Sequence, residues 1–196
     1  MKKIIIICLM LALSFSPITV KAYWQAFSET LGEAIPQEDG FLLVSGIGLT
    51  EDAWDEILLY IDEAEVYDLQ TGFAVGPADI YEGDTVRVAY KPLDQIAGDF
   101  PIAEALEVFI HAGEPGSADF MVVVSDNIWY SDEGCVFVTL DGKYRIVLDE
   151  DTLLLDSYGY EMFFEEITAG MEMFVWANFV TASFPGQVIP DKVVLR

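Results

Sequence analysis

The sequence predicts an all-β protein with short helical turns, arranged as two tandem small β domains. Three observations predict this class: short apolar runs of strand length recur, helical patterns are confined to short pieces, and one β-rich module is present twice. The order of elements within a module fits a small OB-like barrel, and a split β-sandwich fits nearly as well. We expect two small barrels.

The first 22 residues have the pattern of a secretory signal peptide. A basic tip at Lys2 and Lys3 precedes an apolar run over residues 4–15, and Ala22 ends the polar stretch that follows. The run is shorter than the roughly 20 residues that span a bilayer. We therefore expect cleavage after Ala22 and a secreted, extracellular protein without an integral membrane segment, with a retained anchor as the alternative.

Residues 23–38 lie between the expected cleavage site and the first module. Their apolar side chains recur at helical spacing before Pro36: Trp24, Phe27, Leu31 and Ile35. This spacing predicts a short amphipathic helix that packs on the first barrel, and a mobile N-terminal arm is the alternative.

The duplication is visible as pairs of matching residues at a nearly constant spacing. The matches are Ile61-Asp62-Glu63 with Leu148-Asp149-Glu150, Ile80 with Ile167, Gly83 with Gly170, and Val88 with Val175. The apolar run at 41–44 also resembles that at 120–124, and we interpret these runs as the first strand of each module. We predict β domains over residues 39–112 and 117–196, joined by a linker at 113–116.

Each module is expected to contain one helical turn between strands. Pro77 and Gly83 bound the first turn, and residues 163–170 repeat it. The second module is longer between Asn127 and Tyr144, and we interpret the extra residues as an added hairpin.

Short motifs in the second module resemble a β module of secreted Gram-positive bacterial proteins. They are Asp149-Glu150-Asp151-Thr152, then Ile167 and Gly170, then the run from Thr181 to Gln187. Such modules, of unknown function, sometimes accompany domains named for the N-terminal region of copper amine oxidases. The resemblance covers most of the second module and part of the first, and it implies an extracellular accessory module rather than an oxidase.

The charge balance bounds the possible partners. The chain has 34 Asp and Glu against 9 Lys and Arg, a net charge of -25, so we expect no nucleic-acid partner. One His and two Cys are too few for a multi-histidine metal site or a four-cysteine zinc site. Only Cys135 lies beyond the signal peptide, and its apolar neighbours predict burial.

An acidic cluster gives weak candidate ligands for calcium: Asp149, Glu150, Asp151 and Asp156. A loop that starts at Asp149 fails the EF-hand pattern, because Leu154 stands where that loop needs Gly and Tyr160 where it needs Glu. We favour a solubilising acidic surface and expect no cofactor, with calcium as the alternative.

Enzymatic activity is disfavoured. Ser-His-Asp catalysis would have to use His111, and no nucleophile-elbow pattern surrounds any Ser. A hydrolase that uses two carboxylates is a less favoured function. With this many acidic residues, some pair will lie at a suitable distance by chance, so finding one is no evidence of catalysis.

A candidate ligand surface comes from the contrast between the modules. Arg87 and Ala89 of the first correspond to Phe174 and Trp176 of the second. Either the added hairpin covers these two rings, which we favour, or they form an exposed aromatic platform. The loop that follows them supplies the next candidates, Thr181, Ser183 and Gln187. We expect a secreted, non-enzymatic binding or accessory protein that recognises an extracellular protein or glycan, with a calcium-linked structural module as the alternative.

Overall fold

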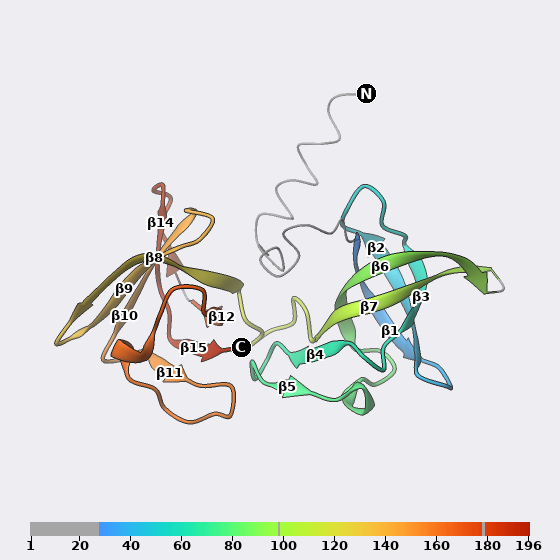
Figure 1. Cartoon of the computed structure of the whole chain (residues 1–196), viewed down its shortest axis with the longest axis horizontal. Helices are drawn as coiled ribbons and strands as arrows, with labels where there is room; N and C mark the ends of the chain where they lie inside the picture. Colours follow the sequence, from blue (N-terminus) through green and yellow to red (C-terminus); the bar gives the residue numbers. More distant parts are fainter. Residues whose placement is uncertain (1–27, 98, 178) are drawn as a thin grey trace. The chain divides into compact units, whose positions relative to one another are not determined.

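The computed structural model describes residues 28–97, 99–177 and 179–196, without the side chains of 92–97. The predicted signal peptide, the cleavage site after Ala22, and Trp24 and Phe27 of the predicted helix lie outside these residues. The described chain divides into two compact units, the first ending at Ser117 and the second beginning at Ala118 (Figure 1). All regular elements in this part of the chain are β-strands or 3-10 turns, and none of its helices could span a membrane.

The first unit is a seven-stranded sheet, five strands of which close into a barrel. The barrel order is β3-β2-β1-β6-β7, and β7 pairs in parallel with β3 to close it. Outside the barrel, β4 pairs in parallel with β7, and β5 pairs with β4. The strands are β1 (Ser28–Pro36), β2 (Phe41–Gly48), β3 (Glu56–Tyr60), β4 (Glu65–Asp68), β5 (Ala74–Val75), β6 (Thr85–Ala97) and β7 (Phe100–Ile110).

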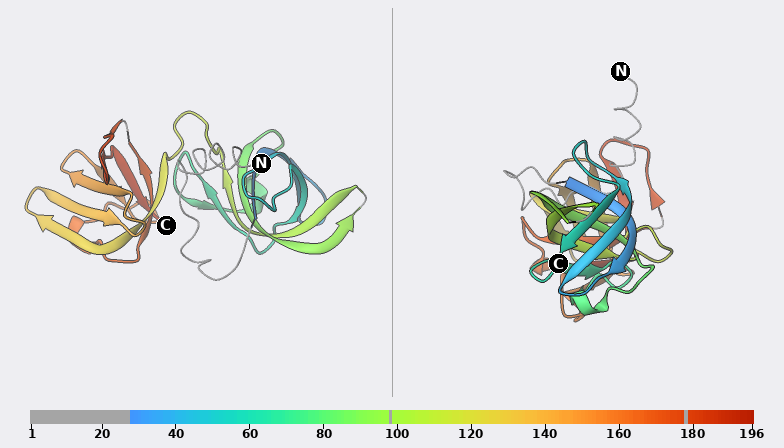
Figure 2. Two further views of the ribbon diagram at one scale, coloured as in Figure 1. Left: turned by 90° about the horizontal axis from the view of Figure 1, so that it is seen from above. Right: turned by 90° about the vertical axis from the view of Figure 1, so that its right-hand side faces the viewer.

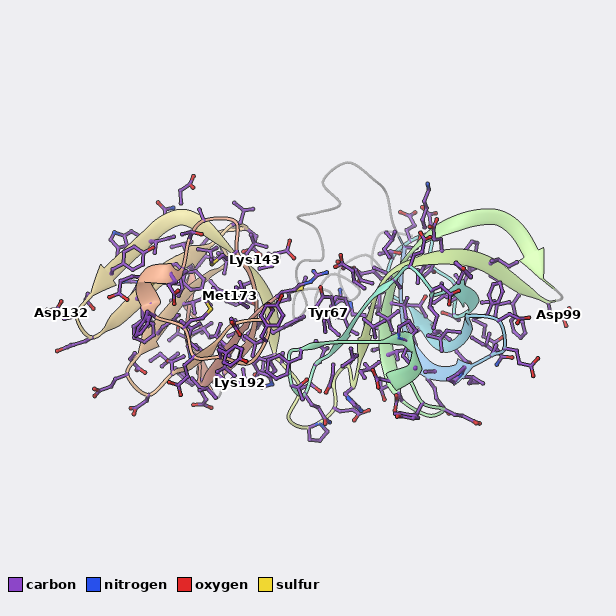
Figure 3. The ribbon with its side chains drawn as sticks, turned by 60° about the horizontal axis from the view of Figure 1, so that its bottom comes forward. Tyr67, Asp99, Asp132, Lys143, Met173 and Lys192 are labelled. Carbon is purple, nitrogen blue, oxygen red and sulfur yellow. The ribbon has the colours of Figure 1, made fainter. Side chains whose placement is uncertain are left out.

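The barrel encloses a core of aliphatic side chains and one tyrosine, Tyr90. The long hairpin of β6 and β7 extends beyond the barrel, as Figure 2 shows, and Asp99 marks its tip in Figure 3. The largest buried members of the core, besides Tyr90, are Leu42, Val44, Ile57, Leu59 and Val86.

Both predicted helical turns are present as 3-10 turns, η1 (Pro77–Asp79) and η2 (Phe164–Glu166). In each turn the acidic third residue accepts a hydrogen bond from the N–H before the turn: Gly76 to Asp79 Oδ2 at 2.8 Å, and Phe163 to Glu166 Oε2 at 2.7 Å. The isoleucine after each turn, Ile80 or Ile167, is buried. The turns thus anchor equivalent side chains in the two cores.

The helix predicted before Pro36 is wrong, because its described residues form strand β1. Thr30 and Ala34 are fully buried, whereas Leu31 and Ile35 are half-buried on the other face. The Thr30 hydroxyl donates to the Trp54 carbonyl at 2.7 Å, which satisfies this polar group inside the barrel. The inner face of β1 is therefore built from small residues, and its apolar spacing gave a false helical signal.

The second unit is an open, mixed sheet of eight strands rather than the expected second closed barrel. Its order is β11-β15-β12-β8-β9-β10-β14-β13, with parallel pairings of β11 to β15 and β10 to β14. The strands are β8 (Phe120–Ser131), β9 (Gly134–Thr139), β10 (Tyr144–Asp149), β11 (Leu153–Leu155), β12 (Glu172–Trp176), β13 (Phe179–Val180), β14 (Gly186–Ile189) and β15 (Lys192–Leu195).

The end of the chain explains why the second sheet stays open. In the first unit the single strand β7 pairs with both β3 and β6. In the second unit the corresponding stretch is divided into β14, which pairs with β10, and β15, which pairs with β12. Pro190 lies between them and has no N–H to donate to a ladder.

Strand pairing in the two units corrects the expected alignment of the two modules. Val88 of β6 pairs with Thr30 and Val108, and Val175 of β12 pairs with Phe120 and Val193. Strand β8 is therefore the counterpart of β1, so the expected match between the runs at 41–44 and 120–124 is wrong.

The same alignment also corrects the interpretation of residues 127–144 as an added hairpin. Strand β9 pairs with β8 on one side and with β10 on the other, as β2 pairs with β1 and β3. Phe137 of β9 is fully buried in the core of this unit. The hairpin is part of the sheet.

The predicted burial of Cys135 is confirmed. Its side chain is 1% exposed and belongs to the same core. Burial, together with the negative charge of Glu165, raises the pKa of the Cys135 thiol to about 11. The thiol is therefore protonated at neutral pH and behaves as a small apolar side chain.

Candidate functional site

Strands β9 and β10 of the second unit alternate between a buried and an outward face. Phe137 and Ile146 point into the core, whereas Val136, Val138 and Arg145 lie on the opposite face. Because successive side chains of a strand point to opposite sides, the outward residues of neighbouring strands form one surface. This surface is the candidate site.

Cross-strand pairing defines the members of this surface. Trp129 of β8 lies opposite Val136, and Val136 lies opposite Val147. Arg145 lies between Val138 and Gln187, and Phe179 lies opposite Ile189. We call this surface the outer face, and its members are Trp129, Val136, Val138, Arg145, Val147, Phe179, Gln187 and Ile189.

The outer face is largely apolar and open to solvent. Trp129 is 55% exposed, Phe179 62% and Ile189 44%. The three valines and Gln187 are half-buried, and Arg145 is exposed. The β8–β9 hairpin that carries Trp129 ends at Asp132, which Figure 3 labels. An indole ring that shares a sheet face with polar side chains is a typical arrangement for binding a ligand.

The corresponding surface of the first unit lacks the two polar side chains. There Leu58 of β3 lies between Leu43 and Ile102, at the position where the second unit has Arg145 between Val138 and Gln187. The register of the strands is the same, so the difference is one of side chains alone. The polar pair is specific to the second unit.

Of the three candidate residues in the predicted loop, Thr181 and Ser183 stabilise the turn, and Gln187 lies on the outer face. The Thr181 hydroxyl accepts a hydrogen bond from the Gln187 N–H at 2.7 Å and lies 2.6 Å from the Ser183 hydroxyl. The Ser183 hydroxyl donates to the Pro185 carbonyl at 2.9 Å. Thr181 and Ser183 therefore hold the turn, while the Gln187 side chain belongs to the outer face.

The two aromatic candidates on β12 have different environments. Phe174 is 1% exposed and so offers no ring to a ligand. Trp176 is half-buried, and the ammonium nitrogen of Lys192 lies 4.0 Å from the centre of its ring. This cation–π contact already occupies one face of the indole.

The acidic candidates shape turns. Asp149 Oδ1 accepts hydrogen bonds from the Asp151 N–H at 3.1 Å and from the Thr152 hydroxyl at 3.2 Å. Asp156 Oδ1 accepts from the N–H groups of residues 158 and 160 at 2.9 and 2.8 Å. Glu150 and Asp151 line a hollow of about 280 Å³. In the described part of the chain, no three acidic, His or Cys side chains are grouped to hold a metal ion.

His111 is paired with a carboxylate. Its Nδ1 lies 2.9 Å from Asp68 Oδ1, and this hydrogen bond raises the pKa of the imidazole. The Ser117 hydroxyl donates to the backbone carbonyl of His111 and not to its ring. The serine nearest in sequence is thus not activated by this imidazole.

Sequence reasoning missed Trp129, Arg145 and the surface they share. The available signals were an arginine, Arg145, within a mainly apolar strand and a tryptophan, Trp129, just before a turn. Both alternating sets of β9 are apolar, so the pattern did not distinguish the outward residues from the buried ones.

Comparisons with known proteins add no identification. No model of a known protein family matches the sequence, and a search of curated proteins finds no significant match. The resemblance to secreted Gram-positive modules stays a prediction.

Proposed function

We propose that the protein is a non-enzymatic, extracellular binding protein that holds a glycan on the outer face of its second unit. The observation that carries this proposal is the shared face of three side chains: exposed Trp129, exposed Arg145 and half-buried Gln187. They lie on one face of the same sheet: Arg145 and Gln187 are on the adjacent strands β10 and β14, and β9 lies between β10 and the strand of Trp129, β8.

The chemistry of a sugar ring suits this combination. A pyranose has an apolar C–H face, which stacks on an indole, and an edge of hydroxyl groups that need hydrogen-bond partners. Trp129 supplies the stacking surface. Arg145 supplies donors, and the Gln187 amide supplies both a donor and an acceptor. The valines between them exclude water from the contact without adding charge.

The strand order supports the proposal by analogy. In the first unit, the barrel strands in chain order are β1, β2, β3, β6 and β7, and their pairing has the order of an OB-like barrel. The second unit follows the same order, with β9 and β10 as its second and third strands. In OB folds these two strands and the adjoining loops bind oligosaccharides or oligonucleotides. A net charge of -25 disfavours the oligonucleotide.

The test is binding of the full chain to an oligosaccharide array, followed by calorimetry with a glycan that the array selects. Trp129→Ala is expected to weaken binding by about tenfold or more, since aromatic stacking contributes on the order of 1 kcal/mol or above. Tyr158→Ala is the matched control, because this residue is an aromatic of the same unit, 84% exposed, outside the outer face.

Unchanged affinity of the Trp129 variant would contradict the proposed surface. Absence of any bound glycan, together with selection of peptides from a peptide library, would replace the glycan with a protein partner. The melting temperatures of both variants should match that of the original chain, since both side chains are exposed.

A further inference from the structure

We infer that the glycan bound by the outer face carries a carboxylate, and that Arg145 is the residue that selects it. This inference rests on the proposed function and names the class of ligand for the same surface. It starts from the charge environment of Arg145.

Arg145 differs from the other described arginines in having no ion pair. Arg87 pairs with Glu29 at 2.5 Å and Arg196 with Glu172 at 3.0 Å, whereas Arg145 pairs with no acidic side chain of the described chain. The sequence has 34 acidic residues, so acidic partners are abundant. A guanidinium left without one is available to a ligand.

The neighbours of Arg145 explain why it has no internal partner. Its cross-strand neighbours are Val138 and Gln187, and the next outward residue on its own strand is Val147. The acid that follows on that side, Asp149, uses Oδ1 to hold its own turn. At the other end of the strand, Lys143 contacts Asp141 at 3.2 Å. No carboxylate of the outer face itself competes for the guanidinium.

The chemistry of arginine favours a carboxylate as its ligand. A guanidinium has five donors and no acceptor in a planar fork that matches both oxygens of a carboxylate. Such charge-assisted pairs are about twice as strong as neutral hydrogen bonds. In an oligosaccharide that contains a single uronic acid, one ring can stack on Trp129 while the carboxylate of the uronic acid pairs with Arg145.

The net charge limits the density of negative charge on the ligand. At -25 the protein repels polyanions at long range, so a densely sulfated or phosphorylated polymer is disfavoured. The first unit, with Leu58 and Ile102 at the corresponding positions, has no such selectivity on its equivalent face.

The test uses two probes that differ at one carboxyl group: an oligosaccharide of neutral sugars that contains a single galacturonic acid, and the same oligosaccharide with that carboxyl group methyl-esterified. The full chain is expected to bind the acid at least about tenfold more tightly than the ester. Arg145→Leu, which introduces the residue of the first unit, is expected to remove this preference and to keep the binding of the ester. Lys91→Leu is the matched control, because it removes one exposed positive charge from the first unit.

The outcomes separate the inference from the proposed function. Equal affinity for acid and ester, lost in Trp129→Ala, would overturn the role of Arg145 and leave the glycan surface in place. An acid preference that survives Arg145→Leu, or that Lys91→Leu also removes, would overturn it as well. No binding of either probe, together with no binding anywhere on the oligosaccharide array, would overturn both.

Discussion

Gly32 of β1 lies directly opposite Gly46 of β2, and neither position has room for a β-carbon. A Cβ on Gly46 would overlap the carbonyl oxygen of Leu31, and one on Gly32 would overlap that of Ser45. The backbones of the two strands therefore approach more closely here than side chains would allow. This approach lets β1 and β2 curve into a barrel of only five strands.

Gly46→Ala is expected to destabilise the first unit by about 1–3 kcal/mol or more, because the overlapping atoms belong to the backbone and cannot rotate away. Gly76→Ala is the control. Apart from its two chain neighbours, a Cβ there would come no closer than 3.6 Å to any atom, so its effect should be small. Urea unfolding of both variants measures the difference, and equal stability of the two would contradict the close approach.

The buried pair of Glu29 and Arg87 gives a second prediction. Both side chains are 10% exposed, and Arg87 Nε donates to Glu29 Oε2 at 3.0 Å. Arg87→Met should cost about 3–5 kcal/mol, because it leaves the Glu29 charge buried without its partner. The double variant Glu29→Met, Arg87→Met should recover most of this loss. A double-mutant cycle by chemical unfolding decides, and additive losses would contradict the coupling.

The pair of His111 and Asp68 predicts a pH dependence. The hydrogen bond to Asp68 raises the pKa of His111 in the folded state, burial opposes this, and the charges of Asp68, Glu114 and Asp84 add to it. The folded imidazole therefore binds its proton more tightly than the unfolded one. Its contribution to stability is fully present below about pH 6.5 and is lost as pH rises through the raised value.

At low pH, the contribution of the same pair to stability depends on the protonation of Asp68. Burial would raise the pKa of this carboxyl, but hydrogen bonds from His111, from the Gln70 N–H and from Thr71 lower it overall. Its contribution is lost as pH falls through this lowered value. Melting temperatures between about pH 4 and pH 9 should therefore differ most between the original chain and His111→Gln in mildly acidic buffer. Parallel curves across that range would rule out the linkage.

Calcium is expected to add no more stability than sodium at the same ionic strength. Asp149 and Asp156, two of the four candidate ligands, each accept two hydrogen bonds that hold turns. Thermal unfolding with calcium and with chelator, at matched ionic strength, separates site binding from screening. A rise that saturates with calcium would show a specific site and favour the cation-linked alternative.

Local backbone signals made part of the fold predictable from the sequence. Gly83 and Gly170 both have positive φ values, 93° and 87°, which glycine adopts without strain. Each follows a 3-10 turn and a buried isoleucine at the predicted place. Such positions are readable because the required conformation restricts the residue type.

Tertiary context hid the rest of the fold and the candidate site. Strand β1 turns Thr30 and Ala34 inward, so it lacks the alternation of large apolar residues that marks a strand. The outer face depends on which strands become neighbours, and no local pattern contains that information. Trp129 and Gln187 are far apart in sequence and share a surface only because β9 and β10 lie between their strands.

The buried thiol of Cys135 gives a chemical probe for opening of the core of the second unit. It is the only cysteine among residues 28–97, 99–177 and 179–196, and a thiol that is both enclosed and protonated does not attack alkylating reagents. In a chain that starts at Tyr23, the rate of alkylation would therefore measure how often this core opens. A dye coupled to a cysteine introduced on the surface would meet no competing thiol while the core stays closed.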